Sequence, residues 1–220
     1  MDISFQQWYE FFGTSPPNIP SPGVDVNRAP EYDVFLSHSG TEKRGIVSIV
    51  RQRLVENYHL KVFVDYESLQ FGDYAPTVME QAAWTTPVGL FVLSKDFLQR
   101  EWPEKELRIF LQRSNMGTNR NVKIVPFFYK VAPRDNNPSL TPEQRALLQE
   151  VSKFTGLEKH WEADFDAELV DKLVSELAKL VDNIKKQGGS SHGSTSGDGS
   201  FLRLNILSNP FISAGSTSAS

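Results

Sequence analysis

Residues 100–107 read REWPEKEL, and this stretch places the ring of Trp102 four residues before the carboxylate of Glu106. In a helix this spacing puts both side chains on one face. Pro103 suits the first position of a helix, so we expect Glu106 in the first turn, where unpaired N–H groups and the helix dipole favour an ionised carboxylate. The pair then offers a fixed negative charge beside a ring that can stack on a ligand. Glu104 lies in the same turn but lacks this spacing.

Both residues also have an ordinary structural explanation. A glutamate in the first turn of a helix is common as a capping charge, and a single tryptophan is more often a core residue than a platform for a ligand. The elements around the pair therefore decide between the two interpretations.

The central part of the chain alternates short apolar runs with amphipathic stretches, and the apolar runs predict strands at residues 32–37, 61–64, 87–93 and 122–129. A helix is expected after the first strand, where Ser39 and Glu42 have the spacing of a capping box, and the last helix is expected at 166–186. Strands that alternate with helices predict a parallel sheet between two helical layers, with ligands at the carboxyl ends of the strands.

The composition excludes several classes of function. The 220 residues carry 23 Lys and Arg against 27 Asp and Glu, a net charge of −4 without a block of like charge, so neither nucleic acid nor an anionic membrane is an expected partner. Cysteine is absent and the four histidines have no ligand spacing, so no metal site is predicted. There is no signal peptide and no apolar run of membrane-spanning length, which favours a cytoplasmic location.

The two ends of the chain differ from the centre in composition. Residues 1–30 begin with aromatic residues and continue with prolines, which predicts an extended arm. Residues 187–220 are rich in Ser and Gly, which predicts a flexible tail, and they contain an unexplained apolar island, FLRLNILSNPFI, at 201–212. The GSSHG at 189–193 has the spacing of a nucleophile elbow but lies in this tail, so we give it no catalytic role.

Four stretches occur in the order and approximate spacing of Toll/interleukin-receptor (TIR) domains. They are YDVFLSHSG (32–40), VFVDYESLQFGD (62–73), REWPEKELRIF (100–110) and VKIVPFFYKVAP (122–133). The chain resembles this family over residues 31–185 and looks closest to the plant-type members through its acidic loop that ends in glycine. The resemblance implies a TIR domain at 31–186 with an α/β, flavodoxin-like fold, in which helices cover both faces of a parallel sheet of about five strands. No other domain is recognisable in these 220 residues, so we expect a TIR-only protein.

The resemblance also implies an activity, because many domains of this family cleave NAD+ at the nicotinamide–ribose bond. Glu106 matches the catalytic glutamate of the family, and Trp102 matches the aromatic residue one turn before it. The nicotinamide of NAD+ is already cationic, so its departure needs no general acid, and one carboxylate can stabilise the developing oxocarbenium ion. NAD+ is then the substrate, no cofactor is expected, and the products are nicotinamide with ADP-ribose or a cyclic variant. The implied setting is immune or cell-death signalling.

Further residues are candidates for contact with the substrate. His38 and Ser39 stand where plant-type domains usually have an aromatic residue and an arginine, and Arg44 is a possible replacement for that arginine. In the loop 65–74, Asp65 and Ser68 are candidates to reach the substrate, although both also suit an ordinary solvated loop.

The loop 65–74 is similar to the BB loop of the family, which borders the cleft and carries self-association contacts. This resemblance implies self-association, and contacts with other TIR proteins, through Tyr66, Leu69, Phe71 and Gly72. Two alternatives stay open. A TIR adaptor without catalysis would use the same surfaces, although it has no need of Trp102 and Glu106. A phosphoacceptor receiver domain is more remote, because the end of the first strand lacks the acidic pair that receivers need.

Overall fold

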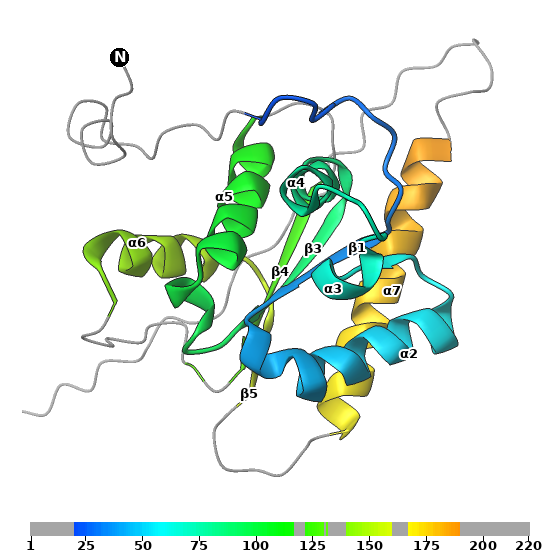
Figure 1. The fold of residues 1–220 in the computed structure, drawn as a ribbon. Helices are drawn as coiled ribbons and strands as arrows, with labels where there is room; N and C mark the ends of the chain where they lie inside the picture. Colours follow the sequence, from blue (N-terminus) through cyan, green and yellow to red (C-terminus); the bar gives the residue numbers. More distant parts are fainter. Residues whose placement is uncertain (1–19, 117–121, 130, 132–139, 160–166, 190–220) are drawn as a thin grey trace, which may run out of the picture.

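The computed structural model describes residues 20–116, 122–129, 131, 140–159 and 167–189. Within them, the strands form one parallel five-stranded sheet in the order β2-β1-β3-β4-β5 (Figure 1). The strands are β1 (Val34–His38), β2 (Val62–Phe63), β3 (Val88–Leu93), β4 (Lys123–Tyr129) and β5 (Leu157–Lys159). This order is that of flavodoxin-like sheets, so the predicted fold class is confirmed.

The helical segments connect the strands and cover the sheet. In chain order they are η1 (Gly40–Glu42), η2 (Lys43–Val47), α2 (Ser48–Tyr58), α3 (Asp65–Ser68), α4 (Ala75–Thr85), η3 (Phe97–Gln99), α5 (Glu101–Asn115), α6 (Pro142–Val151) and α7 (Ala167–Gly189). Helix α7 continues into the first residues of the predicted tail. Among the helices of the described ranges, none combines the length and the apolarity that a membrane span requires.

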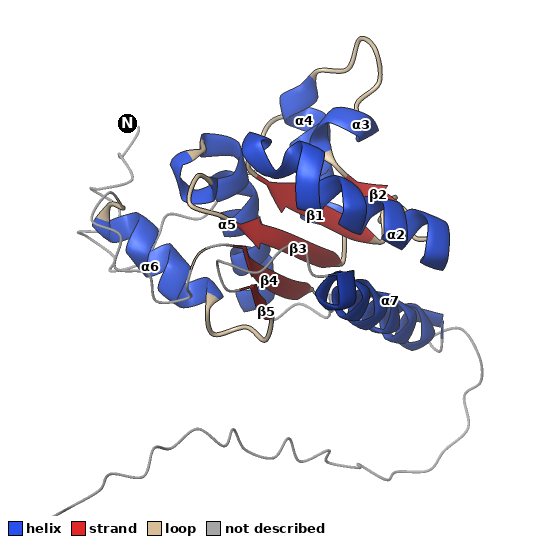
Figure 2. Cartoon of the chain, turned by 90° about the horizontal axis from the view of Figure 1, so that it is seen from below, coloured by secondary structure: helices blue, strands red, loops and turns tan. Residues whose placement is uncertain are grey.

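The two faces of the sheet are buried in separate hydrophobic clusters. Phe35 of β1 belongs to a cluster with residues of α4, α5 and α6, whereas its neighbours Val34 and Leu36 belong to a cluster with residues of α2 and α7. This is the alternation expected of a strand, in which successive side chains point to opposite faces. Figures 1 and 2 show the sheet between these helical layers, with α4 beside α5. Both layers bury β1, which positions the side chains at its carboxyl end.

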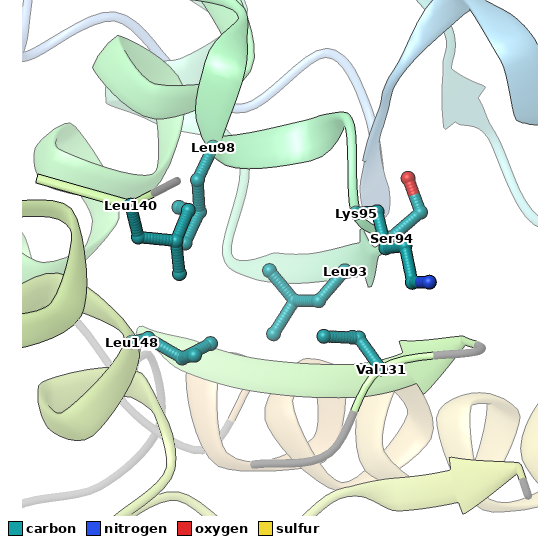
Figure 3. Close-up of a pocket in the computed structure, with 7 residues that line it drawn as sticks. All are labelled: Leu93, Ser94, Lys95, Leu98, Val131, Leu140 and Leu148. Carbon is teal, nitrogen blue, oxygen red and sulfur yellow. The ribbon is translucent and has the colours of Figure 1, made fainter. Parts of the chain in front are cut away.

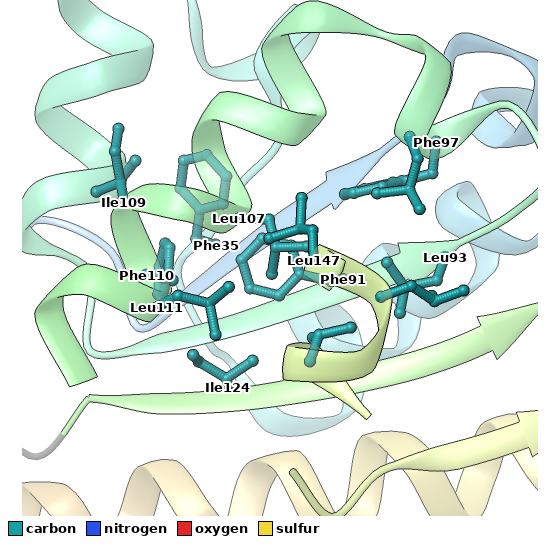
Figure 4. Packing of buried hydrophobic residues seen from close by; sticks show 14 of the residues in the cluster. Phe35, Phe91, Leu93, Phe97, Leu107, Ile109, Phe110, Leu111, Ile124 and Leu147 are labelled. Atoms are coloured by element: carbon teal, nitrogen blue, oxygen red, sulfur yellow. The ribbon is translucent and has the colours of Figure 1, made fainter. Parts of the chain in front are cut away.

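Aromatic rings fill the space between α5 and the sheet (Figure 4). Phe110 of α5 packs edge-on against Phe91 of β3, with 5.2 Å between the ring centroids, and lies 5.6 Å from Phe35 of β1. Gly89 of β3 leaves the room for this packing, because a Cβ there would lie 2.6 Å from the ring of Phe91 and 2.7 Å from that of Phe110. The position of α5 over β1 and β3 therefore depends on this close approach.

The predicted capping box after β1 is wrong. Ser39 precedes η1, but its side chain makes no capping hydrogen bond, and α2 begins only at Ser48 after a kink at Gly45. The Ser39 hydroxyl instead lies 2.9 Å from that of Thr41 and 3.0 Å from that of Ser94, the residue after β3. Ser39 thus joins the segments that follow β1 and β3.

Part of the predicted arm packs on the domain. We call residues 20–27 the N-terminal segment; its Ser21 and Asp25 form hydrogen bonds with Glu80 and Gln81 of α4. Residues 1–19 of the arm, and the predicted tail from residue 190 with its apolar island at 201–212, lie outside the described residues.

Candidate functional site

A small pocket opens at the carboxyl end of β1, between that strand, the start of α3 and the start of α5. It has a volume of about 30 Å³, enough for water but not for an aromatic ring. Its lining residues are Phe35, Leu36, Ser37, His38, Phe63, Asp65, Met79, Trp102, Pro103 and Glu106. Four of the residues singled out in the sequence, which come from three distant segments of the chain, therefore meet here: Glu106, Trp102, His38 and Asp65.

Glu106 is buried, with 5% of its surface exposed, and its Oε2 accepts a hydrogen bond of 2.5 Å from the hydroxyl of Ser37. Helix α5 begins at Glu101, before Pro103, and the N–H of Glu104 already donates to the carbonyl of Arg100. Glu106 is therefore beyond the unpaired N–H groups of the helix end, and its predicted place in the first turn is wrong.

Burial also reverses the expected charge of Glu106. The pKa of this carboxyl is raised from 4.5 to about 8, mainly by desolvation; the charge of Asp65 also raises it, whereas the hydrogen bond from Ser37 and the charge of His38 lower it. At neutral pH the resting side chain is therefore largely protonated, whereas the helix dipole alone predicted an anion. A cation that enters the pocket stabilises the ionised form, so the charge of Glu106 is coupled to what binds beside it.

His38 connects the end of β1 with the start of α3. Its Nδ1 lies 2.7 Å from the carbonyl oxygen of Ser39 and donates to it, because a carbonyl can only accept. Its Nε2 lies 3.5 Å from Oδ1 of Asp65. Burial acts to lower the pKa of His38, but the interactions with Asp65 and Ser39 and the charge of Glu106 raise it above its usual value overall. The charged form of His38 is thus favoured beside the two carboxyl groups.

Trp102 is half-buried and borders the same pocket as Glu106. The ammonium group of Lys105 lies 5.0 Å from the centroid of its ring, within the range of a cation–π contact. The predicted pairing of Trp102 and Glu106 at one site agrees with this geometry, although the role of each residue stays a prediction.

Three other candidates lie away from this pocket. Ser39 is fully buried against Ser94, which lines a second, much smaller cavity of about 10 Å³ enclosed mainly by leucines (Figure 3). Arg44 is exposed on η2. The hydroxyl of Ser68 accepts a hydrogen bond of 2.9 Å from the N–H of Val64, which holds α3 at the end of β2.

Ser37 is a site residue that the sequence analysis missed. It lies two residues after Phe35 in β1, so its side chain faces α5, and its own exposed fraction is 2%. The available signal was a hydroxyl in an otherwise apolar strand, on the strand face that the helix of Glu106 covers.

The loop after α3 presents aromatic side chains to solvent. Phe71 is fully exposed and Tyr74 is 73% exposed, while Gly72 between them has a φ of +96°, a conformation that favours glycine. Leu69, by contrast, packs against the core, and Tyr66 lies in α3. Part of the predicted self-association loop is therefore exposed to solvent, and part of it packs on the core.

The described part of the chain holds no group of three or more His, Asp or Glu residues that could bind a metal ion.

Comparisons with known proteins agree with this fold. Residues 34–175 match the family model for the TIR domain. NAD(+) hydrolase PdTIR of Paracoccus denitrificans is 31% identical over 123 residues, which cover 56% of this chain and 40% of that protein. NAD(+) hydrolase TirS of Staphylococcus aureus is 33% identical over 105 residues, which cover 48% and 36% respectively. The chain therefore matches less than half the length of these bacterial relatives.

The TIR domains of the activated Roq1 resistosome have a similar fold, with a TM-score of 0.50 and 22% identity over 68% of this chain and 99% of that one. The sheet order, the family match over more than half of the chain and this structural likeness agree. The chain belongs to the TIR-domain family.

Proposed function

We propose that this chain is an NAD+ hydrolase that cleaves the bond between nicotinamide and ribose, with Glu106 as the catalytic carboxylate. One observation carries the proposal: Glu106 is buried beside Trp102 in a pocket at the carboxyl end of β1, with Ser37 donating a hydrogen bond to it. The names of the two bacterial relatives, both NAD(+) hydrolases, support the same activity.

The chemistry of the bond suits a single carboxylate. When the bond between the ribose carbon and the ring nitrogen breaks, its electron pair leaves with nicotinamide, which becomes neutral, and positive charge develops on the ribose. The ionised form of Glu106 stabilises that charge, and burial strengthens the interaction because little water screens it. Water then adds to the ribose carbon and releases a proton, which gives ADP-ribose. A pKa near 8 lets Glu106 accept that proton close to neutral pH.

The raised pKa also has a role in binding. The resting carboxyl is largely protonated, and the cationic ring of NAD+ favours its ionisation as the substrate enters. His38, which lies in the same pocket with Asp65, stabilises the carboxylate of Glu106 when its own ring is protonated. We place both residues at the substrate-binding side of the site.

Opening of the pocket is part of the proposal, because a volume of about 30 Å³ does not admit nicotinamide. Asp65, the first residue of α3, lies on its wall, and the loop that follows α3 carries the exposed ring of Phe71. We propose that self-association through this loop moves α3 and activates the enzyme. The plant-type subclass, the cyclic product and the immune or cell-death setting are expectations from the sequence resemblance. The cytoplasmic location is an expectation from the sequence, which shows neither a signal peptide nor an apolar run of membrane-spanning length.

The test is nicotinamide release from NAD+ by the purified chain at high concentration. Glu106→Gln removes the charge with little change in shape and is expected to abolish release. Glu104→Gln is the matched control, because Glu104 lies on the same helix but pairs with Arg108 at 2.7 Å. Loss in the first variant alone supports the proposal. If concentrated wild-type protein releases no nicotinamide, the activity is excluded and the TIR adaptor becomes the better description.

A further inference from the structure

A buried carboxylate on α4, Glu80, lies outside the pocket and has no place in the reaction described above. Its side chain is 2% exposed, and its oxygens receive hydrogen bonds from the N–H and the hydroxyl of Ser21, at 2.8 and 2.7 Å. Burial acts to raise the pKa of Glu80, but the hydrogen bonds from Lys105 and Ser21 hold it below its usual value. Glu80 is thus a fixed anion between the N-terminal segment and α5.

Lys105 of α5 is the cationic partner of Glu80, with its Nζ 2.8 Å from Oε2. An exposed ion pair contributes little because both long side chains must be ordered. Here one partner is already immobile, since Glu80 is buried and bound by Ser21. The ammonium group of Lys105 is therefore held at a defined place beside α4.

The same ammonium group lies 5.0 Å from the ring centroid of Trp102, three residues earlier on α5. Residues at this spacing are neighbours on a helix surface, so the contact alone is unremarkable in a helix. The additional feature is the buried anion that fixes the cation, so that the ring contacts a group that cannot move freely. Trp102 borders the pocket of Glu106.

We infer that Lys105, held by Glu80, is a positioning residue that keeps the ring of Trp102 at the edge of the pocket. The expected effect of Lys105 on the reaction rests on the proposed function, whereas its expected effect on the position of the Trp102 ring does not. A ring that is ordered before the substrate arrives lowers the entropic cost of binding. The effect therefore belongs to KM for NAD+ rather than to kcat, because the ring does not take part in bond cleavage.

The first measurement concerns the ring alone and needs no substrate. Acrylamide quenching of tryptophan fluorescence is measured for the full chain and for its Trp102→Phe variant. The difference between the two signals gives the quenching of Trp102 alone. Lys105→Met is expected to increase the quenching of Trp102, whereas Lys105→Arg, which keeps the charge and can stack on a ring, leaves it near the wild-type value. Unchanged quenching in Lys105→Met overturns the inference.

The second measurement is steady-state nicotinamide release. Lys105→Met is expected to raise KM for NAD+ by about three- to tenfold with kcat within about twofold, the size of effect expected from one lost cation–π contact. Lys105→Arg restores KM. Gln81→Ala is the matched control, since Gln81 binds Asp25 of the same N-terminal segment and is the neighbour of Glu80 on α4; its KM stays at the wild-type value.

The outcomes separate this inference from the proposed function. Absence of release from every variant, wild type included, contradicts the hydrolase, and the quenching result then decides the positioning of the ring by itself. Release with the same KM in Lys105→Met and wild type overturns the positioning role and leaves the hydrolase intact. A rise in KM that Lys105→Arg does not reverse also overturns it, because it points to a general disturbance of α5.

Discussion

At the scale of the residue, the environment of Glu106 outweighs its position in the helix. The spacing from Trp102 indicated a shared site, and the two side chains do border one pocket. The helix dipole suggested an anion, but that field is confined to the first turn and α5 begins at Glu101. Burial of 95% of the residue's surface is the larger effect, because the charged form loses its water, and the pKa rises to about 8.

This pKa predicts how stability depends on pH. Below pH 4.5 the carboxyl of Glu106 is protonated in the folded and the unfolded chain, so it has no effect. Between pH 4.5 and about 8 the unfolded chain loses this proton while the folded chain keeps it, so the free energy of unfolding falls as pH rises. Glu106→Gln removes this dependence, and its stability relative to wild type is expected to increase by about 3 kcal/mol from pH 5 to pH 8.

Urea unfolding of both proteins at pH 5, 6, 7 and 8 measures this difference. Glu104→Gln is the control on the same helix, and its curve is expected to run parallel to that of wild type over this range. A Glu106→Gln curve that is also parallel to wild type shows that the folded carboxyl titrates near its ordinary pKa.

At the scale of the element, the sequence predicted the type and order of the helices and strands better than it predicted where they end and which side chains pair between them. The four predicted strands appear at β1 to β4, because runs of apolar residues fit a sheet that is covered on both faces. β5 spans Leu157–Lys159, a segment with a single apolar residue and therefore no apolar run, and it was not located. Ser39 and Glu42 have the spacing of a capping box, yet the hydroxyl of Ser39 pairs with that of Ser94, which follows the neighbouring strand β3. Residue spacing within one segment cannot reveal such a long-range contact. Ser37 was missed for the same reason.

The packing of α5 on β3 gives a prediction at this scale. Gly89→Ala adds a Cβ that would lie within 2.8 Å of the ring of Phe110, so α5 must shift away from the sheet. We expect a loss of about 1–3 kcal/mol in the free energy of unfolding. Nicotinamide release is expected to fall as well, because α5 carries Glu106. Gly40→Ala is the control, since a Cβ there meets nothing within 4 Å. Equal urea midpoints for the two variants contradict this account of α5.

At the scale of the whole molecule, the order of the sheet explains why residues from distant segments meet. β1 lies between β2 and β3, so the segments that follow β1 and β2 both leave at one edge of the sheet, where His38 and Asp65 come together. The loop after α3 begins at this same edge and ends at α4, whose Glu80 contacts α5. Asp65, the first residue of the α3 that precedes this loop, lines the pocket, so the loop and the pocket wall are joined by one short helix.

The exposed rings of this loop predict how activity depends on concentration. Phe71 is fully exposed and Tyr74 is 73% exposed, and exposed aromatic residues of this kind are frequent anchors of protein–protein contacts. Replacement of both by serine is expected to weaken self-association by about tenfold or more, because two aromatic anchors are lost. Wild-type nicotinamide release per molecule is expected to rise with protein concentration, and the double variant is expected to need correspondingly higher concentrations to reach the same release.

Met116→Ser is the control, since Met116 is 56% exposed just beyond the far end of α5. Sedimentation velocity and nicotinamide release, measured on the same dilution series, test both parts of this prediction. If the double variant associates as wild type does, the contact surface lies elsewhere on the domain. If it associates less but its release is unchanged, self-association through this loop is not what opens the pocket.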